Sequence, residues 1–260
     1  MLLYSGKSDV GMRRKINQDI YGAMPIWNDE ALLLVVCDGM GGHKAGDTAS
    51  KTALEAFCSI VKSRPCMAED PIMRSETIKN TLVAAVKEAN ETVYKLAQSS
   101  DAYTGMGTTL VAAIISHGML YAVNIGDSRL YIITRHEARQ ITRDHSFVQF
   151  LLQTGQITPE EAKKNPRKNV ITRAVGVSSK TEVDFFNINL RKWGSGYILL
   201  CTDGLTNYLD DKTLFELLFQ SREKVNPSPQ DELDKKTATL VNFANKSGGS
   251  DNITVVLAKF

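Results

Sequence analysis

The chain has 260 residues, of which 43% are hydrophobic and 23% charged, and its formal net charge is +2. A chain of this length buries a sizeable core without needing disulfides or structural metals for stability, and it fits one large domain. The near-neutral charge argues against a nucleic-acid binder, and the longest apolar run, residues 31–37, is too short to span a bilayer.

Two amphipathic helical patterns dominate the first half of the chain. They are expected at about residues 45–61 and 78–97, because apolar residues recur there every three or four positions. Apolar runs at 108–115, 120–125 and 129–133 then predict strands. The connections between these strands are short and contain glycine, which favours antiparallel pairing.

The second half begins with a polar stretch at residues 144–176. It carries short helical pieces and the basic residues Lys163, Lys164, Arg167 and Lys168, so it reads equally well as a lid over a site or as a solvated excursion. Beyond it the pattern predicts strands near 182–190 and 197–201, helices near 211–219 and 229–245, and a last strand at 253–259. This order of elements predicts a layered α+β domain.

Four aspartates stand where an apolar strand meets a glycine-containing turn. They are Asp38, Asp127, Asp203 and Asp251. One such aspartate is usually just a turn residue, but four of them at strand ends predict a cluster of carboxylates that repel one another unless cations lie between them. Oxygen ligands without histidine or cysteine suit magnesium, manganese or calcium rather than zinc.

Other catalytic motifs fail on inspection. Residues 38–44 do not fit the GxGxxG pattern, no phosphate loop of the GxxxxGK[ST] type is present, and residues 126–130 lack the last glycine of a nucleophile elbow. Cys58 and Arg64 have the spacing of cysteine-dependent phosphatases. The residues between them contain no glycine and lie at the end of a helical pattern, so we interpret that match as chance.

Eight segments carry a more specific signal, and they extend over almost the whole chain. They are residues 11–19 (GMRRKINQD), 38–43 (DGMGGH), 105–110 (GMGTTL), 126–129 (GDSR), 144–146 (DHS), 171–176 (ITRAVG), 201–205 (CTDGL) and 250–254 (SDNIT). In this order they resemble the motifs of the metal-dependent type 2C protein phosphatases in their compact bacterial form. The resemblance implies one domain over residues 1–260, with a flap at about 145–170. It also implies two antiparallel sheets packed face to face between helices, in the layer order α-β-β-α.

The resemblance also implies a metal site. Asp38 would bridge two divalent cations, manganese or magnesium, and the Gly39 carbonyl would help to hold one of them. Asp203 and Asp251 would hold the other cation, and Asp127 matches the position that binds a third, weaker one.

Further residues take roles from the same match. Arg14 corresponds to the arginine that grips the phosphate, and Gln18, Asp19 and Asn252 to residues that orient metal ligands or waters. His43 reads equally as a general acid or as a residue that merely starts a helix near the metals. The implied reaction is hydrolysis of phosphoserine and phosphothreonine by a water activated between two cations, without a phosphoenzyme.

Two positions depart from the family pattern. Some relatives have glutamate where this chain has Gln18, and the loss of that charge predicts weaker binding of one metal. Asn165 stands where many members have a histidine before the flap proline, which affects the flap rather than the chemistry.

Three alternatives to a general phosphatase stay open on the sequence alone. They are a phosphatase of this fold dedicated to one regulatory protein, a pseudophosphatase that only binds partners, and another two-metal hydrolase such as a nuclease. The expected partners are phosphorylated proteins, including a serine/threonine kinase and its substrates, with no nucleic acid and no membrane insertion. The N-terminus lacks a secretory signal and the four cysteines show no CxxC spacing, so we expect a cytoplasmic protein. A monomer is the default expectation.

Overall fold

The structure is a computed structural model that describes residues 2–42, 45–219 and 228–260. In chain order, its elements are β1 (Tyr4–Asp9), β2 (Asp19–Ile26), β3 (Ala31–Met40), α1 (Ala45–Ser63), α2 (Pro71–Ala97), η1 (Asp101–Tyr103), β4 (Gly107–Thr108), β5 (Leu110–Ser116), β6 (Met119–Ile125), β7 (Arg129–Thr134), β8 (Ala138–Gln140), α3 (Phe147–Gln153), α4 (Pro159–Lys164), β9 (Asp184–Asn189), η2 (Leu190–Lys192), β10 (Gly196–Cys201), α5 (Asp203–Thr206), α6 (Asp211–Phe219), α7 (Pro229–Lys246) and β11 (Ile253–Lys259).

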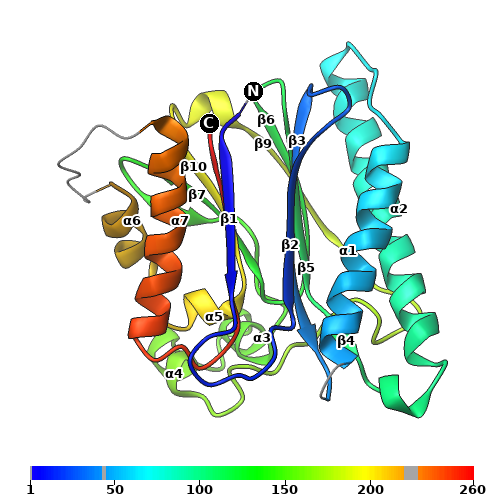
Figure 1. Ribbon diagram of the computed structural model, residues 1–260, viewed down its shortest axis with the longest axis vertical. Helices are drawn as coiled ribbons and strands as arrows, with labels where there is room; N and C mark the ends of the chain where they lie inside the picture. The colour runs from blue at the N-terminus through cyan, green and yellow to red at the C-terminus, as the bar shows by residue number, and fades with distance from the viewer. Residues whose placement is uncertain (1, 43–44, 220–227) are drawn as a thin grey trace.

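These elements form four layers, as Figure 1 shows. One sheet has the strand order β1-β11-β10-β7-β8, and the other has the order β2-β3-β5-β6-β9 with β4 paired to β3. Every strand pairing is antiparallel, which confirms the predicted α-β-β-α architecture. Helices α1 and α2 cover the outer face of the second sheet, and α6 and α7 cover that of the first.

Strand β3 shows how a continuous apolar run serves two cores at once. Side chains alternate across a strand, so Leu33 and Val35 pack against Ala49, Ala53 and neighbouring residues of α1, in the core between sheet and helices. The intervening residues Leu32, Leu34 and Val36 face the other sheet. A strand buried on both faces reads as an unbroken apolar run, because neither face can be polar.

Helix α2 begins earlier than the apolar pattern predicts. The side chain of Asp70, the residue just before the helix, accepts hydrogen bonds from the backbone N–H groups of Ile72 and Met73. Pro71 occupies the first turn. These are start signals in their own right, because proline lacks the N–H that a first turn leaves unpaired. The first turns project Ile72 and Met73 into solvent, so the apolar periodicity appears only near Ile78.

Three strands, β1, β2 and the short β8, were not among the predicted elements. Strand β1 (YSGKSD) is largely polar and lies at the edge of its sheet, paired only with β11. Strand β2 (DIYGAMPI) contains a glycine and a proline and is likewise an edge strand. Edge strands tolerate proline and polar residues, so their composition carries little strand signal.

The sandwich has two distinct ends. The chain termini lie together at one end, with the turns that connect β2 to β3 and β5 to β6 (Figure 1). The opposite end carries the loop between β1 and β2, the start of α1 and helix α5 (Figure 1). Within the described residues, no helix has the length and apolarity needed to cross a membrane.

Candidate metal centre and active site

The four aspartates of the sequence prediction lie at the end of the sandwich away from the termini. Asp38 comes from the second sheet, while Asp203 and Asp251 flank strands β10 and β11 of the first. Asp127 lies in the turn between β6 and β7. Two of these local settings differ from the predicted turns. Asp38 lies inside β3, because the strand continues by pairing with β4, and Asp203 is the first residue of helix α5.

The other carboxylates act on Asp38 in one direction. Burial raises the pKa of its carboxyl well above the usual range, and the charges of Asp19, Asp203, Asp127 and Asp251 raise it further. Asp38 therefore lies within electrostatic reach of the other three aspartates of the predicted cluster and of Asp19.

The neighbouring carboxyl groups respond in the same direction. Burial, reinforced by the charge of Asp203, raises the pKa of Asp127 to about 8. Burial also raises the pKa of Asp203, and Asp251 adds to this effect. Asp19 lies opposite Asp38 in the β2–β3 register, accepts a hydrogen bond from the Thr202 hydroxyl at 2.9 Å, and has its pKa raised by burial to about 7. Such a cluster is stable in ionised form only with positive charge nearby.

The backbone around Asp38 is held rigidly. Its N–H donates to Thr109 Oγ1 at 2.9 Å, and its carbonyl accepts from the Thr108 hydroxyl at 2.9 Å. A Cβ on Gly39 would lie 2.0 Å from the carbonyl oxygen of Gly46 and 2.7 Å from that of Gln18. No side chain fits there, so the close approach of three backbone segments requires glycine at position 39.

Arg14 reaches the cluster and contacts a predicted metal ligand. Its Nη2 donates to Asp251 Oδ2 at 2.8 Å, and its side chain is half-exposed. This hydrogen bond raises the pKa of Arg14, and the charges of Asp38 and Asp203 add to the shift. The guanidinium therefore lies beside the carboxylates and open to solvent, where a phosphate can reach it.

Asn252 holds the loop that carries Arg14. Its amide donates to the carbonyls of Val10 and Ile16, and its Oδ1 accepts from the Gln18 N–H at 2.9 Å. All of these partners are backbone atoms, so Asn252 fixes the loop next to Asp251. Gln18 directs its side-chain amide towards the Gly41 carbonyl at 3.5 Å.

The donor set fits hard divalent cations, because it consists of carboxylate and carbonyl oxygens only. Within residues 2–42, 45–219 and 228–260, no three carboxylate, imidazole or thiolate groups already converge on one point. The aspartates are thus close enough to perturb one another without forming a finished cage, and their assignment as ligands stays a prediction. His43, the other predicted catalytic residue, lies outside the described residues.

One part-buried and one buried pair near Asp127 were not among the predicted site residues. Arg129 donates to both carboxylate oxygens of Asp144, with Nη2 2.7 Å from Oδ2. The His145 ring accepts a hydrogen bond from the Gly126 N–H at 3.1 Å. Both pairs lie within the GDSR and DHS segments, so the sequence contained the signal, but only the fold shows that these segments meet.

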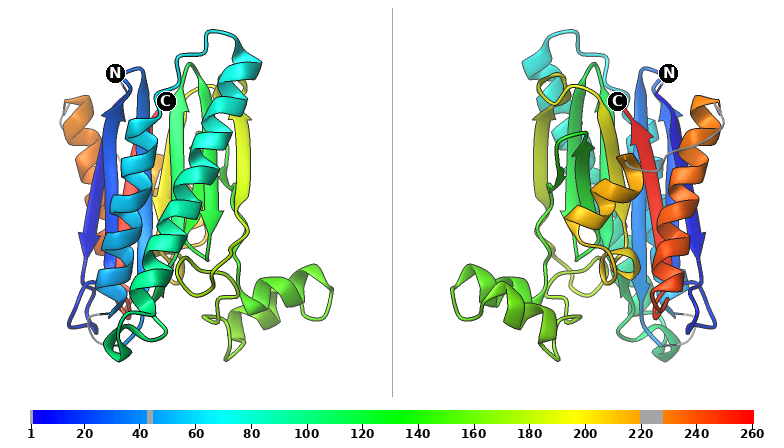
Figure 2. Two further views of the ribbon diagram at one scale, coloured as in Figure 1. Left: turned by 90° about the vertical axis from the view of Figure 1, so that its right-hand side faces the viewer. Right: turned by 90° about the vertical axis from the view of Figure 1, so that its left-hand side faces the viewer.

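The stretch from 144 to 176 leaves the sandwich beside this site. Helices α3 and α4 project away from the sheets in Figure 2. The stretch is anchored at both ends, because His145 N–H donates to the Gly126 carbonyl and Val175 exchanges two backbone hydrogen bonds with Thr108. Between these anchors, the Arg167 guanidinium stacks 4.1 Å from the centre of the Phe147 ring. The predicted flap therefore borders the carboxylate cluster through these two anchors.

Known proteins share this fold and sequence. A model of the family described as "Protein phosphatase 2C" matches residues 12–242. A serine/threonine phosphatase stp of Listeria monocytogenes is 38% identical over 253 residues, which cover 97% of this chain and 94% of the relative.

Solved structures agree with this match. The serine/threonine phosphatase Stp1 from Staphylococcus aureus has a TM-score of 0.86 and 36% identity, covering 100% of this chain and 95% of that one. The catalytic domain of the phosphatase PstP in complex with two manganese ions has a TM-score of 0.79 and 33% identity, covering 99% and 97%. The chain therefore belongs to the protein phosphatase 2C family and is a serine/threonine protein phosphatase of that family.

Proposed function

We propose that this phosphatase uses divalent cations held at the aspartate end of the sandwich. Asp38 and the Gly39 carbonyl hold one cation, Asp38 with Asp203 and Asp251 hold a second, and Asp127 contributes to a third, weaker site. The observation that carries the proposal is the position of Asp38. Desolvation raises the pKa of its part-buried carboxyl and the charges of four other carboxylates raise it further, an arrangement that calls for bound positive charge.

Manganese or magnesium fits the oxygen donors best. When bound, such a cation pair supplies Lewis acidity and lowers the pKa of a coordinated water, so that hydrolysis needs no phosphoenzyme. The solved PstP structure with two manganese ions supports manganese as one cation that this fold accepts.

Arg14 supplies the positive side chain that orients the phosphate. Its guanidinium now donates to Asp251 Oδ2, the oxygen that a cation would also need. Asp251 would hold a cation through this same oxygen, which cannot serve both partners equally well, so the Arg14 guanidinium would be released from it. The released guanidinium is planar and can donate two parallel hydrogen bonds to two oxygens of a phosphoryl group, which stabilises the charge that develops on them.

The remaining site residues orient these groups. Asp19 holds the Thr202 hydroxyl just before Asp203, and Asn252 fixes the loop of residues 10–18 against Asp251. Gln18 contributes hydrogen bonds but no charge. The role of His43 as general acid stays a prediction, because this residue lies outside the described part of the chain.

The proposed substrates are proteins phosphorylated on serine or threonine by a cellular kinase, and the phosphatase opposes that kinase. The Arg14 side chain is exposed enough for a phosphorylated segment of another protein to reach it. A cytoplasmic location and a monomeric state belong to the same proposal and stay predictions.

The test is release of phosphate from a phosphothreonine peptide with and without manganese. We expect hydrolysis only with manganese, and its loss in Asp203→Asn, which keeps the size of the side chain but removes its charge. Asp234→Asn is the matched control, because Asp234 is exposed on α7. Full activity in excess chelator would exclude the mechanism. Manganese binding without hydrolysis of any phosphopeptide would favour a partner-binding pseudophosphatase.

A further inference from the structure

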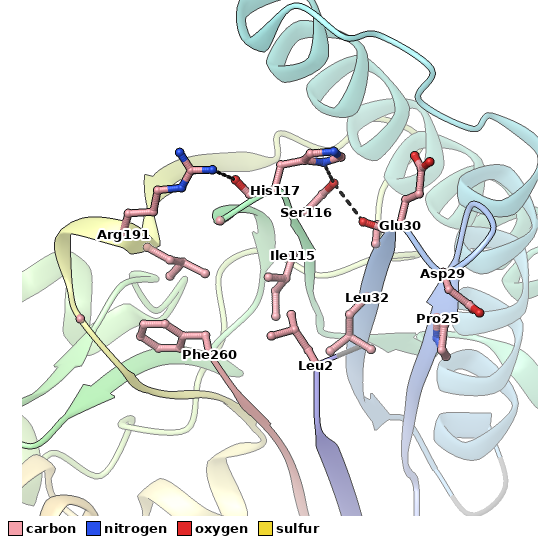
Figure 3. Close-up of a pocket in the computed structure, with 14 residues that line it drawn as sticks. Leu2, Pro25, Asp29, Glu30, Leu32, Ile115, Ser116, His117, Arg191 and Phe260 are labelled. Atoms are coloured by element: carbon pink, nitrogen blue, oxygen red, sulfur yellow. Dashed lines mark hydrogen bonds between the residues drawn. The ribbon is translucent and has the colours of Figure 1, made fainter.

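A cavity opens at the end of the sandwich opposite the aspartates (Figure 3). Its volume is about 470 Å³, within the range of small-molecule sites. Leu32 lines it, and Asp38 lies six residues further along the same strand, a distance of about 20 Å at the usual rise per residue. The cavity is thus separate from the catalytic site.

The interior of the cavity is apolar and belongs to both sheets. Leu32 and Ile115 come from β3 and β5, while Leu2 and Phe260 flank β1 and β11 of the other sheet. All four extend the core between the sheets, with Leu2 and Phe260 only half-buried. Figure 3 shows these side chains directed towards one another beneath the rim. An apolar chain inserted there would contact both sheets and lose its exposure to water.

The rim carries charge of opposite sign on its two sides. Arg191 lies on one side, where its Nη2 donates to the His117 carbonyl at 3.2 Å. The absence of a side chain at Gly118 lets Arg191 lie across this turn, since a Cβ there would be 2.8 Å from Nε. Among the described residues, no carboxylate lies within 4.0 Å of the Arg191 guanidinium. Asp29 and Glu30 occupy the other side.

We propose that this cavity binds an amphipathic carboxylate, with its single acyl chain between the sheets and its carboxylate on Arg191. The Arg191 guanidinium donates to one backbone carbonyl and, among the described residues, has no carboxylate partner, so at the mouth of an apolar cavity it selects one anionic group next to an apolar body. The acidic side of the rim disfavours a second anionic group. Because the ligand contacts both sheets, its binding stabilises the folded chain.

Octanoate is the probe, and octylamine is the control for an apolar chain with the opposite charge. We expect octanoate to shift the amide resonances of Leu32 and Ile115 and to raise the temperature of unfolding. Arg191→Gln weakens octanoate binding about tenfold, because a hydrogen bond to a charged group is lost. Lys192→Gln is the matched control, an exposed neighbour that does not line the cavity. Leu2→Trp fills the apolar space and removes binding.

Three results would overturn this proposal. They are the absence of any octanoate-induced shift at Leu32 and Ile115, equal binding of octylamine, and an equal loss of affinity in Arg191→Gln and Lys192→Gln. The last two results would show that the apolar chain of the probe or the general surface charge, rather than Arg191 at the rim, determines binding.

A second inference concerns His145, which is buried beside the turn that carries Asp127. Its Nδ1 accepts from the Gly126 N–H, so the ring proton resides on Nε2, which lies 3.2 Å from Asp184 Oδ2. Arg173 Nη1 donates to Asp184 Oδ1 at 3.1 Å and also lies 3.3 Å from His145 Nε2. These contacts fix the ring, and the ring fixes the Ile125–Gly126 peptide, one residue before Asp127.

We infer that His145 is a positioning residue for the third cation site, an inference that rests on the proposed function. His145→Asn retains an acceptor near the position of Nδ1, whereas His145→Gln retains only a donor near that of Nε2. The Asn variant therefore keeps slow exchange of the Gly126 amide proton and the weak third manganese affinity. The Gln variant loses both, with affinity reduced about 10–100-fold.

Calorimetry with manganese and hydrogen exchange at Gly126 together decide this inference. Equal behaviour of the two variants would overturn the positioning role. If the wild type binds only two manganese ions, the third cation site in the proposed function is wrong. The exchange rates at Gly126 then still decide whether His145 holds the peptide.

Discussion

The two ends of the sandwich are built from the same strands and have opposite chemistry. At one end the two sheets contribute Asp38, Asp203 and Asp251, whose charges perturb one another. At the other end the same sheets contribute Leu32 and Phe260 to an apolar cavity. The strands between them are buried on both faces and hold the two ends at a fixed separation. A rigid interior thus allows each end to carry a separate site.

The two ends also differ in their effect on the stability of the folded chain. The apolar end is compatible with folding, because it extends the inter-sheet core. The aspartate end opposes folding whenever its carboxyl groups are ionised without cations, because buried like charges are unfavourable. The predictions below test this difference, from the largest expected effect to the smallest.

Asp38→Asn has the largest expected effect, and it acts in two directions. Phosphatase activity falls by more than about a hundredfold, since even partners of metal ligands affect activity by 10–100-fold. The metal-free protein becomes more stable, by about 2–4 °C for each kcal/mol of relieved repulsion. Phosphate release and thermal unfolding in chelator measure the two effects. A variant destabilised without metal would contradict the electrostatic account.

Gly39→Ala tests the close packing behind the cluster. The added Cβ would lie 2.0 Å from the Gly46 carbonyl oxygen, so β3 or the start of α1 must move. We expect a loss of about 2–3 kcal/mol in the free energy of unfolding, together with weaker manganese binding. Gly42→Ala is the control, because a Cβ at Gly42 meets nothing within 4 Å. Denaturant titration of both variants tests the prediction, which fails if they lose equal stability.

The pH dependence of the metal-free protein has a defined sign. The pKa of Asp19 is raised from 3.8 to about 7 and that of Asp127 from 3.8 to about 8. The folded state therefore binds more protons than the unfolded state between these values, and stability falls as the pH rises from about 4 to about 8. Manganese should accordingly raise the unfolding temperature more at about pH 8 than at about pH 5. An equal shift at both values would contradict the account.

Ile115→Val has the smallest expected effect and probes the apolar end. Loss of one methylene from a residue that borders a cavity costs about 0.5–1.5 kcal/mol of stability. Activity with saturating manganese should stay unchanged, because the site is at the other end of the strands. Thermal unfolding and phosphate release measure both. A large loss of activity would mean that the two ends are not independent.

The fold was predictable where burial is strong. The buried strands and the long helices have clear apolar patterns, and the resemblance supplied the layer order. The edge strands β1 and β2 lacked such a pattern, because their exposed sides accept polar residues, glycine and proline. The start of α2 depended on capping by Asp70 rather than on periodicity.

The sequence indicated a set of candidate site residues but not their arrangement. The aspartates at strand ends indicated a carboxylate cluster, and the structure gathers Asp38 with the others. The contact between Arg14 and Asp251 joins positions 237 residues apart, which no local pattern reveals. The cavity at Arg191 likewise depends on turns and termini that meet only in the folded chain.

The central claim is that cations complete the aspartate end, and anomalous diffraction from crystals grown with manganese tests it most directly. The account predicts two strong peaks that share the Asp38 carboxylate, one of them also in contact with Asp203 and Asp251, together with displacement of Arg14 from Asp251. Crystals with no peak at this end, and Arg14 still bonded to Asp251, would contradict it.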